Sequence, residues 1–234
     1  HRLIRRQRQM CIRDRDNTGK YTSLLWEPNE YINIMVYPFT DSQILGISTF
    51  PYSLKDFFLE GTQQVSASWI TLENLSFPYC ISINSSYIYE QSTDERINQN
   101  DAAITLAHEL GHYLGLRHVF SEGGTTSMCT DTDYCKDTPS YNRSEYEQWL
   151  NNLDKQNKYQ LKDLAKRYSC EKGEYEAHNI MDYAYCFYNE ITLEQRKRIR
   201  HILNYSPLIP GPKESRIDTR GVQGRLNLPI CIMK

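Results

Sequence analysis

Three histidines and one glutamate lie within eleven residues of this 234-residue chain, in the pattern His-Glu-x-x-His-x-x-Gly-x-x-His. His108 and His112 are four positions apart, so on a helix both imidazoles project from one face and can bind the same metal ion. Glu109 directly follows the first histidine and places a carboxylate beside water held at that metal. Gly115 favours a positive φ, which ends the helix and lets His118 return to the same ion.

Three neutral imidazoles supply three ligands of a tetrahedral zinc ion and leave the fourth position open to water. An open position is typical of a catalytic zinc site and not of a structural one. The alternative interpretation is an amphipathic helix whose histidines occupy ordinary core or surface positions. It leaves unexplained why three of the six histidines in the chain fall in this short segment. The spacing therefore favours a catalytic zinc site with Glu109 as the general base.

The elements that must position this site are also readable from residue patterns. Asn100 and Asp101 are good N-cap residues, and apolar residues follow them at helical spacing, so we expect the zinc helix to begin there. Residues 31–39 and 80–89 alternate apolar and polar side chains and predict strands, and residues 44–51 predict another. Residues 143–169 predict one or two polar helices.

A capping-box pattern at Thr192 and Gln195 predicts the start of a further helix. It ends before the three prolines of residues 206–212, which cannot continue a helix. Strands before the zinc helix and helices after it indicate an α+β fold.

Charge is unevenly distributed along the chain. The formal net charge is −2, and residues 1–15 hold six arginines and one aspartate, or +5, which leaves −7 for the rest. We interpret residues 1–15 as a non-native, Arg-rich leader, because they show no clear hydrophobic pattern. The remaining negative charge opposes nucleic-acid binding. No apolar run is long enough for a transmembrane segment, and no signal peptide is visible, so we expect any export signal to lie upstream of this chain.

Asp133, Asp137 and Thr138 place three hard oxygen donors close together in a polar segment. Such donors can bind calcium. A solvated loop is the commoner explanation of a polar segment, and the sequence leaves both interpretations open.

Seven cysteines are present, and excluding Cys11 with the leader leaves six. An even number is compatible with disulfides in an oxidising compartment, whereas the alternative is buried free thiols. Four of the cysteines bracket the segment after His118 and the methionine at 181, and four cysteines allow three pairings. They are Cys129, Cys135, Cys170 and Cys186.

The zinc signature, followed after sixty-three residues by Met181 in Asn-Ile-Met-Asp-Tyr, resembles the metzincin metallopeptidases. Within them it is most similar to the pappalysin family. The Gly-Leu-x-His end of the zinc motif, residues 133–139 and the helix start at 192–198 support this likeness, which covers about residues 30–213. Residues 206–213 also resemble the closing segment of bacterial zinc-dependent metalloproteinase lipoproteins.

The resemblance implies a metzincin-like zincin catalytic domain over residues 16–205. Its upper lobe, a mixed sheet with the zinc helix, would reach to about residue 118, and an irregular, partly helical lower lobe would follow. Residues 16–30 are too few for the strand and long helix that normally open the upper lobe, so we expect that lobe to be truncated at its N-terminus. We expect residues 206–234 to form an extended tail.

The resemblance also implies roles for single residues. Met181 would form the methionine turn under the metal, and Tyr183 would lie close to the zinc and contact the developing oxyanion. The strand at 80–89 would be the edge strand along the cleft. Pappalysins that prefer a basic residue after the scissile bond carry an acid after the methionine turn, and here Ala184 and Tyr185 stand instead. The likeness favours the pairings Cys129–Cys170 and Cys135–Cys186.

These features together predict a zinc-dependent endopeptidase that hydrolyses protein or peptide substrates. The resemblance places it outside the cytoplasm, either secreted or held at the cell envelope as a lipoprotein whose lipid anchor lies upstream. The rival hypothesis is a catalytically impaired zinc-binding fragment that captures peptides without turnover.

Overall fold

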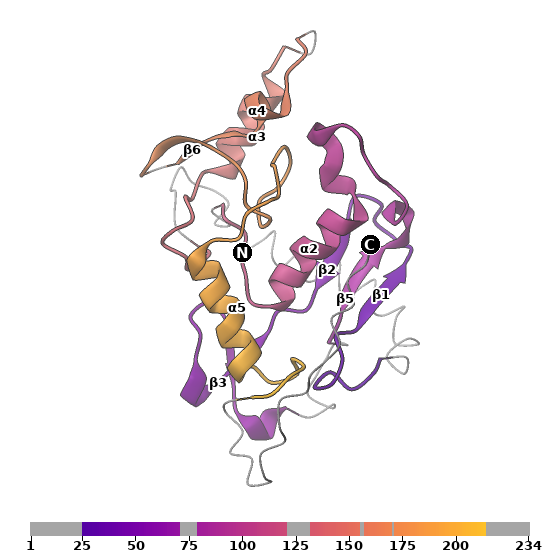
Figure 1. Ribbon diagram of the computed structural model, residues 1–234, viewed down its shortest axis with the longest axis vertical. Helices are drawn as coiled ribbons and strands as arrows, with labels where there is room; N and C mark the ends of the chain where they lie inside the picture. Colours follow the sequence, from indigo (N-terminus) through magenta and orange to yellow (C-terminus); the bar gives the residue numbers. More distant parts are fainter. Residues whose placement is uncertain (1–24, 71–78, 121–131, 155–156, 170, 214–234) are drawn as a thin grey trace, which may run out of the picture.

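A computed structural model of the chain describes residues 25–70, 79–120, 132–154, 157–169 and 171–213. Its central sheet has the strand order β1-β5-β2, with β1 parallel and β2 antiparallel to β5. These strands are β1 (Ile34–Tyr37), β2 (Gly46–Ser48) and β5 (Ile81–Asn84). The sheet lies beside helix α2 (Ala102–Tyr113), which carries the first two histidines of the signature (Figure 1). The predicted α+β fold with a mixed sheet is confirmed.

The strand predicted at 80–89 is not the edge strand. β5 lies in the middle of the sheet, and all four of its residues are buried. Its isoleucines, Ile81 and Ile83, are suited to a strand that is covered on both faces. The strand beside α2 is β2, whose Gly46 pairs with Ile83. The expectation that β5 borders the cleft is therefore wrong, and β2 takes that place.

Helix α2 begins and ends where its sequence predicts. Asp101 is its N-cap, Tyr113 is its last residue, and Gly115 follows with a φ of +88°. The capping box of helix α5 (Leu193–Tyr205) is also confirmed, because Gln195 N donates to Thr192 Oγ1 at 3.3 Å and Thr192 N donates to Gln195 Oε1 at 3.0 Å. Helices α2 and α5 share a core with β5, to which Ile81, Tyr113 and Ile202 contribute.

A second, mainly aromatic core lies around Met181, and it contains Leu116, Phe120, Tyr141 and Tyr146. Its elements are helix α3 (Arg143–Asn151), helix α4 (Leu161–Leu164) and an antiparallel hairpin of β6 (Lys166–Ser169) and β7 (Gly173–Glu176). Residues 166–169 were expected to be helical and instead form a strand. The remaining elements are a parallel pair, β3 (Tyr52–Leu54) with β4 (Gln63–Val65), and 3-10 turns at Lys55–Phe57, Ala67–Trp69, Ser85–Tyr87 and Glu95–Asn100.

The folded chain continues past residue 205. Leu208 and Ile209 are buried in the core with Tyr113, whose hydroxyl donates to the Leu208 carbonyl at 3.3 Å. Residues 206–209 are therefore packed on the domain, whereas Gly211 and Pro212 are exposed, and the extended tail stays a prediction. The leader at 1–15 and residues 214–234 lie outside the described residues.

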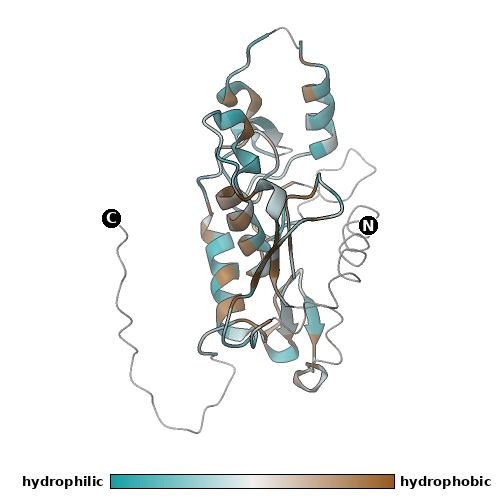
Figure 2. Ribbon diagram, turned by 90° about the vertical axis from the view of Figure 1, so that its right-hand side faces the viewer, coloured by the Kyte–Doolittle hydropathy of each residue, from teal (hydrophilic) through white to brown (hydrophobic). Residues whose placement is uncertain are grey.

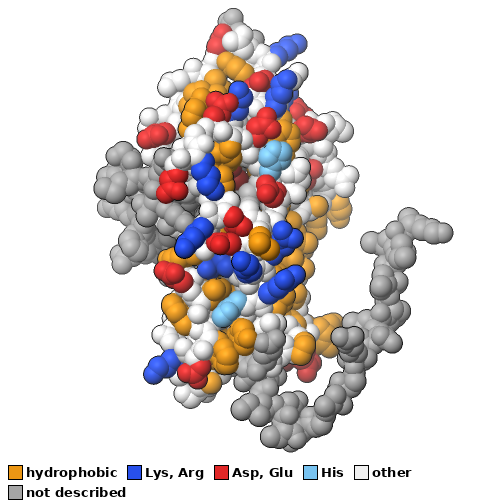
Figure 3. All heavy atoms as spheres, turned by 60° about the vertical axis from the view of Figure 1, so that its left-hand side comes forward, with side chains coloured by type: hydrophobic (Ala, Val, Ile, Leu, Met, Phe, Trp, Pro, Cys, Tyr) orange, Lys and Arg blue, Asp and Glu red, His pale blue; other side chains and the backbone are white. Residues whose placement is uncertain are grey.

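Hydrophobic residues concentrate on the central strands and on the helix faces turned toward them, whereas α3 is mostly hydrophilic (Figure 2). On the face drawn in Figure 3, acidic and basic side chains are intermixed. None of the helices in the described part of the chain is long and apolar enough to cross a membrane.

Candidate metal centre and active site

The three histidines of the signature converge on one point. His112 Nε2 lies 3.0 Å from His118 Nε2, and His118 Nε2 lies 3.2 Å from His108 Nε2. A tetrahedral ion with metal–nitrogen bonds of about 2.0–2.1 Å requires nitrogens about 3.3 Å apart, so this spacing fits a metal. Within the described residues, these histidines form the only group of three or more His, Cys, Asp or Glu side chains arranged to hold one.

The other ring nitrogens of His108 and His112 hold these two imidazoles in the correct tautomer. His108 Nδ1 donates to the Ile180 carbonyl at 2.7 Å, and His112 Nδ1 donates to the Leu116 carbonyl at 2.8 Å. Because a carbonyl only accepts, the proton is on Nδ1 and the Nε2 lone pair faces the shared point. Burial lowers the pKa of His108 to about 4, so that ring is neutral at pH 7, as a metal ligand must be.

Glu109 is buried beside the triad, against the edge strand. A Cβ added at Gly46 of β2 would lie 2.6 Å from Glu109 Cγ and 3.0 Å from its Oε1, so only glycine leaves room for this carboxylate. Burial raises the pKa of Glu109 to about 8, and a zinc ion held by the three histidines would lower it again. A cavity of about 390 Å³ is lined by Glu109, His108 and Gly46. Glu109 therefore supplies an acid–base group to this cavity, beside the triad.

Met181 lies directly beneath the metal-binding helix. It is fully buried, and a Cβ added at Gly111 of α2 would overlap its sulfur. Its carbonyl also accepts a hydrogen bond from Val119 N at 3.4 Å, next to His118. The sequence analysis did not identify Gly111, although a glycine in a helix interior is a recognisable signal because it costs up to about 1 kcal/mol relative to alanine.

Tyr183 lies against the triad. Its ring centroid is 4.5 Å from that of His118 and 5.4 Å from that of His108. Arg143, a residue that the sequence analysis missed, places its guanidinium carbon 4.5 Å above the Tyr183 ring. Tyr183, Ala184 and Arg143 all line the cavity beside Glu109.

The predicted pairing of Cys135 with Cys186 is wrong. Both thiols are free and buried, and each has its own partner: Cys186 Sγ donates to the Ala177 carbonyl at 3.2 Å, and Cys135 Sγ donates to the Asp133 carbonyl at 3.6 Å. These contacts hold the two thiols in separate places. Cys129 and Cys170 lie outside the described residues.

The oxygen donors considered for calcium make contacts within the chain. Asp133 accepts from Cys135 N at 2.9 Å and from the Thr138 hydroxyl at 2.6 Å. Asp137 accepts from Glu194 N at 2.9 Å, in the first turn of α5. Asp137 therefore ties the segment to α5, whereas these contacts of Asp133 and Thr138 lie within the segment, and calcium binding remains an untested prediction.

Comparison with known proteins identifies several similar chains. Two curated relatives, each named extracellular metalloprotease, come from Arthroderma otae and Arthroderma benhamiae and are 31% and 30% identical over 188 residues. Each alignment covers 79% of this chain and 55% of the relative, so the chain spans about half the length of these proteins. The structure of Tannerella forsythia mature mirolysin in complex with a cleaved peptide gives a TM-score of 0.45 at 23% identity, over 75% of this chain and 53% of mirolysin.

The model of the peptidase M43 family, described as pregnancy-associated plasma protein-A, matches residues 61–204. That match contains the whole histidine signature, Met181 and Tyr183, and it covers more than half of the chain. The resemblance stated from the sequence is therefore confirmed: the chain belongs to the peptidase M43 family, the pappalysins.

Proposed function

We propose that this chain is a zinc-dependent endopeptidase that hydrolyses peptide bonds in proteins, with Glu109 as its general base. The observation that carries the proposal is the convergence of three Nε2 atoms next to a buried carboxylate on the wall of a cavity. The family membership and the names of the relatives support it.

His108, His112 and His118 would hold the zinc, which when bound acts as a Lewis acid toward a peptide carbonyl and acidifies water. Glu109 accepts the proton of the attacking water and delivers it to the leaving amine. Its burial and its contact with β2 keep the carboxylate at the cavity wall throughout. The Tyr183 hydroxyl donates a hydrogen bond to the developing oxyanion, a contribution typically worth about 2.7–4 kcal/mol.

Protein or peptide substrates and an extracytoplasmic location belong to the same proposal. The relatives are named extracellular metalloproteases, which supports secretion or attachment to the cell envelope. Calcium at Asp133, Asp137 and Thr138 stays a separate, untested prediction, since these side chains already make hydrogen bonds within the chain.

Metal removal tests the proposed function. We expect the chain to digest an unfolded protein, to lose this activity in a zinc chelator, and to regain it when one zinc per chain is restored, measured by metal analysis and peptide release. His118→Ala should bind less zinc under the same chelation, because only two imidazoles remain. Full zinc occupancy of His118→Ala would contradict the assigned ligands. Stoichiometric zinc without any digestion would favour the non-catalytic peptide-binding alternative.

The walls of the cavity lead to a prediction about cleavage preference. Its apolar walls include Ile44, Leu45 and Ile104. Its acids are Glu109 and Asp182, and Asp182 is already paired with the buried Arg167 at 3.4 Å. We therefore expect a weaker preference for Lys or Arg after the cut than is usual in the family, measured by mapping cleavage in a peptide library.

A matched pair of variants sharpens this prediction. Ala184→Asp adds an acid to the cavity wall at a position with a φ of +40°, which Asp tolerates better than most residues, and Ala184→Asn makes the same change in shape without the charge. We expect cleavage before basic residues to increase about tenfold in Ala184→Asp alone. Strict Lys or Arg selection by the unchanged chain would overturn the prediction.

A further inference from the structure

The segment after the methionine turn has an unusual backbone. Ala184 and Tyr185 are consecutive non-glycine residues with φ values of +40° and +45°. L-amino acids rarely adopt this left-handed conformation, because Cβ approaches the following carbonyl oxygen. The surrounding structure must therefore hold the segment in place.

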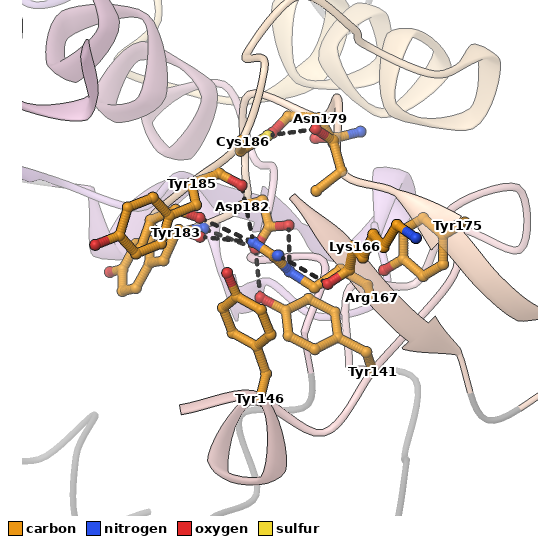
Figure 4. Close-up of polar contacts among 12 residues, drawn as sticks. Tyr141, Tyr146, Lys166, Arg167, Tyr175, Asn179, Asp182, Tyr183, Tyr185 and Cys186 are labelled. Atoms are coloured by element: carbon orange, nitrogen blue, oxygen red, sulfur yellow. Dashed lines mark hydrogen bonds and ion pairs between the residues drawn. The ribbon is translucent and has the colours of Figure 1, made fainter. Parts of the chain in front are cut away.

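A single buried side chain binds all three carbonyls of this segment. Arg167 Nη2 donates to the carbonyls of Ala184 at 2.8 Å, Tyr183 at 3.2 Å and Tyr185 at 3.5 Å. Figure 4 shows the guanidinium at the centre of these contacts. The left-handed turn directs successive carbonyls to one point, and the guanidinium fills that point.

The other side of the guanidinium is also anchored, although Nε makes no hydrogen bond. Its Nη1 donates to the carbonyls of Leu164 at 3.0 Å and Lys166 at 3.2 Å. Its Nε lies 3.4 Å from Asp182 Oδ2, and its Cζ lies 3.7 Å above the Tyr146 ring. Arg167 is 1% exposed. It therefore connects β6 and α4 to the residues that follow Met181.

The segment of residues 183–185, whose carbonyls Arg167 binds, forms part of the wall of the cavity beside Glu109. Tyr183 and Ala184 both line that cavity, and the Tyr183 ring touches His108 and His118. A shift of the segment would thus change the shape of the cavity and the position of the Tyr183 hydroxyl without moving a metal ligand.

We propose that Arg167 is a positioning residue, which fixes the left-handed segment 183–185 and thereby sets which substrate side chains the cavity accepts. This inference rests on the proposed peptidase function. Arg167 has no contact with substrate of its own in this role. It acts through the backbone carbonyls that it binds.

Arg167→Lys tests the proposal, because lysine keeps the positive charge but lacks the planar fork that spans both sets of carbonyls. We expect kcat/KM to fall about 10–100-fold. The ratio of kcat/KM for two peptides that differ only in alanine or leucine after the cut should change about tenfold. Zinc content should remain one per chain, measured by metal analysis.

Removing one charge of a buried pair can prevent folding, so a second variant removes both. Arg167→Gln with Asp182→Asn leaves no unpaired buried charge but still lacks the fork. We expect the same change in the peptide ratio. Arg198→Lys is the matched control: Arg198 is another buried arginine, and its guanidinium binds the Gly115 and Glu60 carbonyls instead. It should lower the melting temperature and leave the ratio unchanged.

Amide hydrogen exchange provides a readout that depends on neither zinc nor turnover. We expect roughly tenfold faster exchange at residues 183–186 in both Arg167 variants, with helix α2 unchanged. A peptide ratio that stays within twofold of the parent in both variants would show that Arg167 is only structural and would overturn the proposal. If the unchanged chain cleaves neither peptide, the proposed function fails. In that case, unchanged amide exchange at residues 183–186 would independently refute the proposal that Arg167 fixes this segment.

Discussion

Glu109→Gln is expected to retain one zinc per chain and to lose peptide hydrolysis by about 10²–10⁴-fold. Glutamine has nearly the same shape as glutamate, so it fits in the space between α2 and Gly46. That space holds the residue 109 side chain only because residue 46 has no Cβ. Its amide cannot accept the proton of the attacking water. The measurements are kcat/KM on an unfolded protein and zinc content by metal analysis.

Glu95→Gln is the matched control for this variant. It makes the same chemical change at an exposed position outside the cavity walls, in the 3-10 turn before α2. Activity of Glu109→Gln within about tenfold of the parent, with zinc retained, would remove Glu109 from the general-base role.

The metal site was predictable from sequence because its determinants are local. The position of α2 follows from three local signals: two ligands four residues apart, an N-cap at Asp101, and Gly115 shortly after the last helical residue. Together they define the helix ends to within one or two residues. Thr192 and Gln195 likewise mark the start of α5 through their own reciprocal hydrogen bonds. Such signals require no knowledge of distant parts of the chain.

Features that depend on distant contacts were missed or misplaced. The strand predicted at residues 44–51 is present as the three-residue β2, but its place at the sheet edge follows from pairing with β5, which is 35 positions further along the chain at the Ile47–Ser82 pair. Arg167 is charged and stands between Lys166 and Tyr168, so its sequence context predicts a surface side chain, yet the structure buries it against Tyr183–Tyr185 carbonyls. The predicted Cys135–Cys186 disulfide was likewise an inference about residues far apart in the chain. The positions of cysteines in a sequence do not tell which of them lie close together in the fold.

Gly115→Ala is expected to lower the free energy of unfolding by about 2–5 kcal/mol and to weaken zinc binding. Two effects combine at this position. The φ of +88° costs a residue with a Cβ about 1–2 kcal/mol. The new Cβ would also lie 2.7 Å from Cγ1 of the fully buried Ile202, and overpacking of this kind costs about 1–3 kcal/mol. Denaturant unfolding of the zinc-free chain gives the stability, and competition with a chelator gives the zinc affinity.

Gly173→Ala separates the two effects. Gly173 has a similar φ of +79°, in the hairpin of β6 and β7, but nothing lies within 4 Å of its added Cβ. The free energy of unfolding of Gly173→Ala should fall only by the backbone contribution, about 1–2 kcal/mol. Its zinc affinity should not change, because residue 173 belongs to the hairpin and not to the turn that carries His118. The difference between the two variants then measures the contact of residue 115 with Ile202, which presses α5 against the turn that returns His118 to the metal. Equal losses in the two variants, or unchanged zinc affinity in Gly115→Ala, would show that this contact does not position His118.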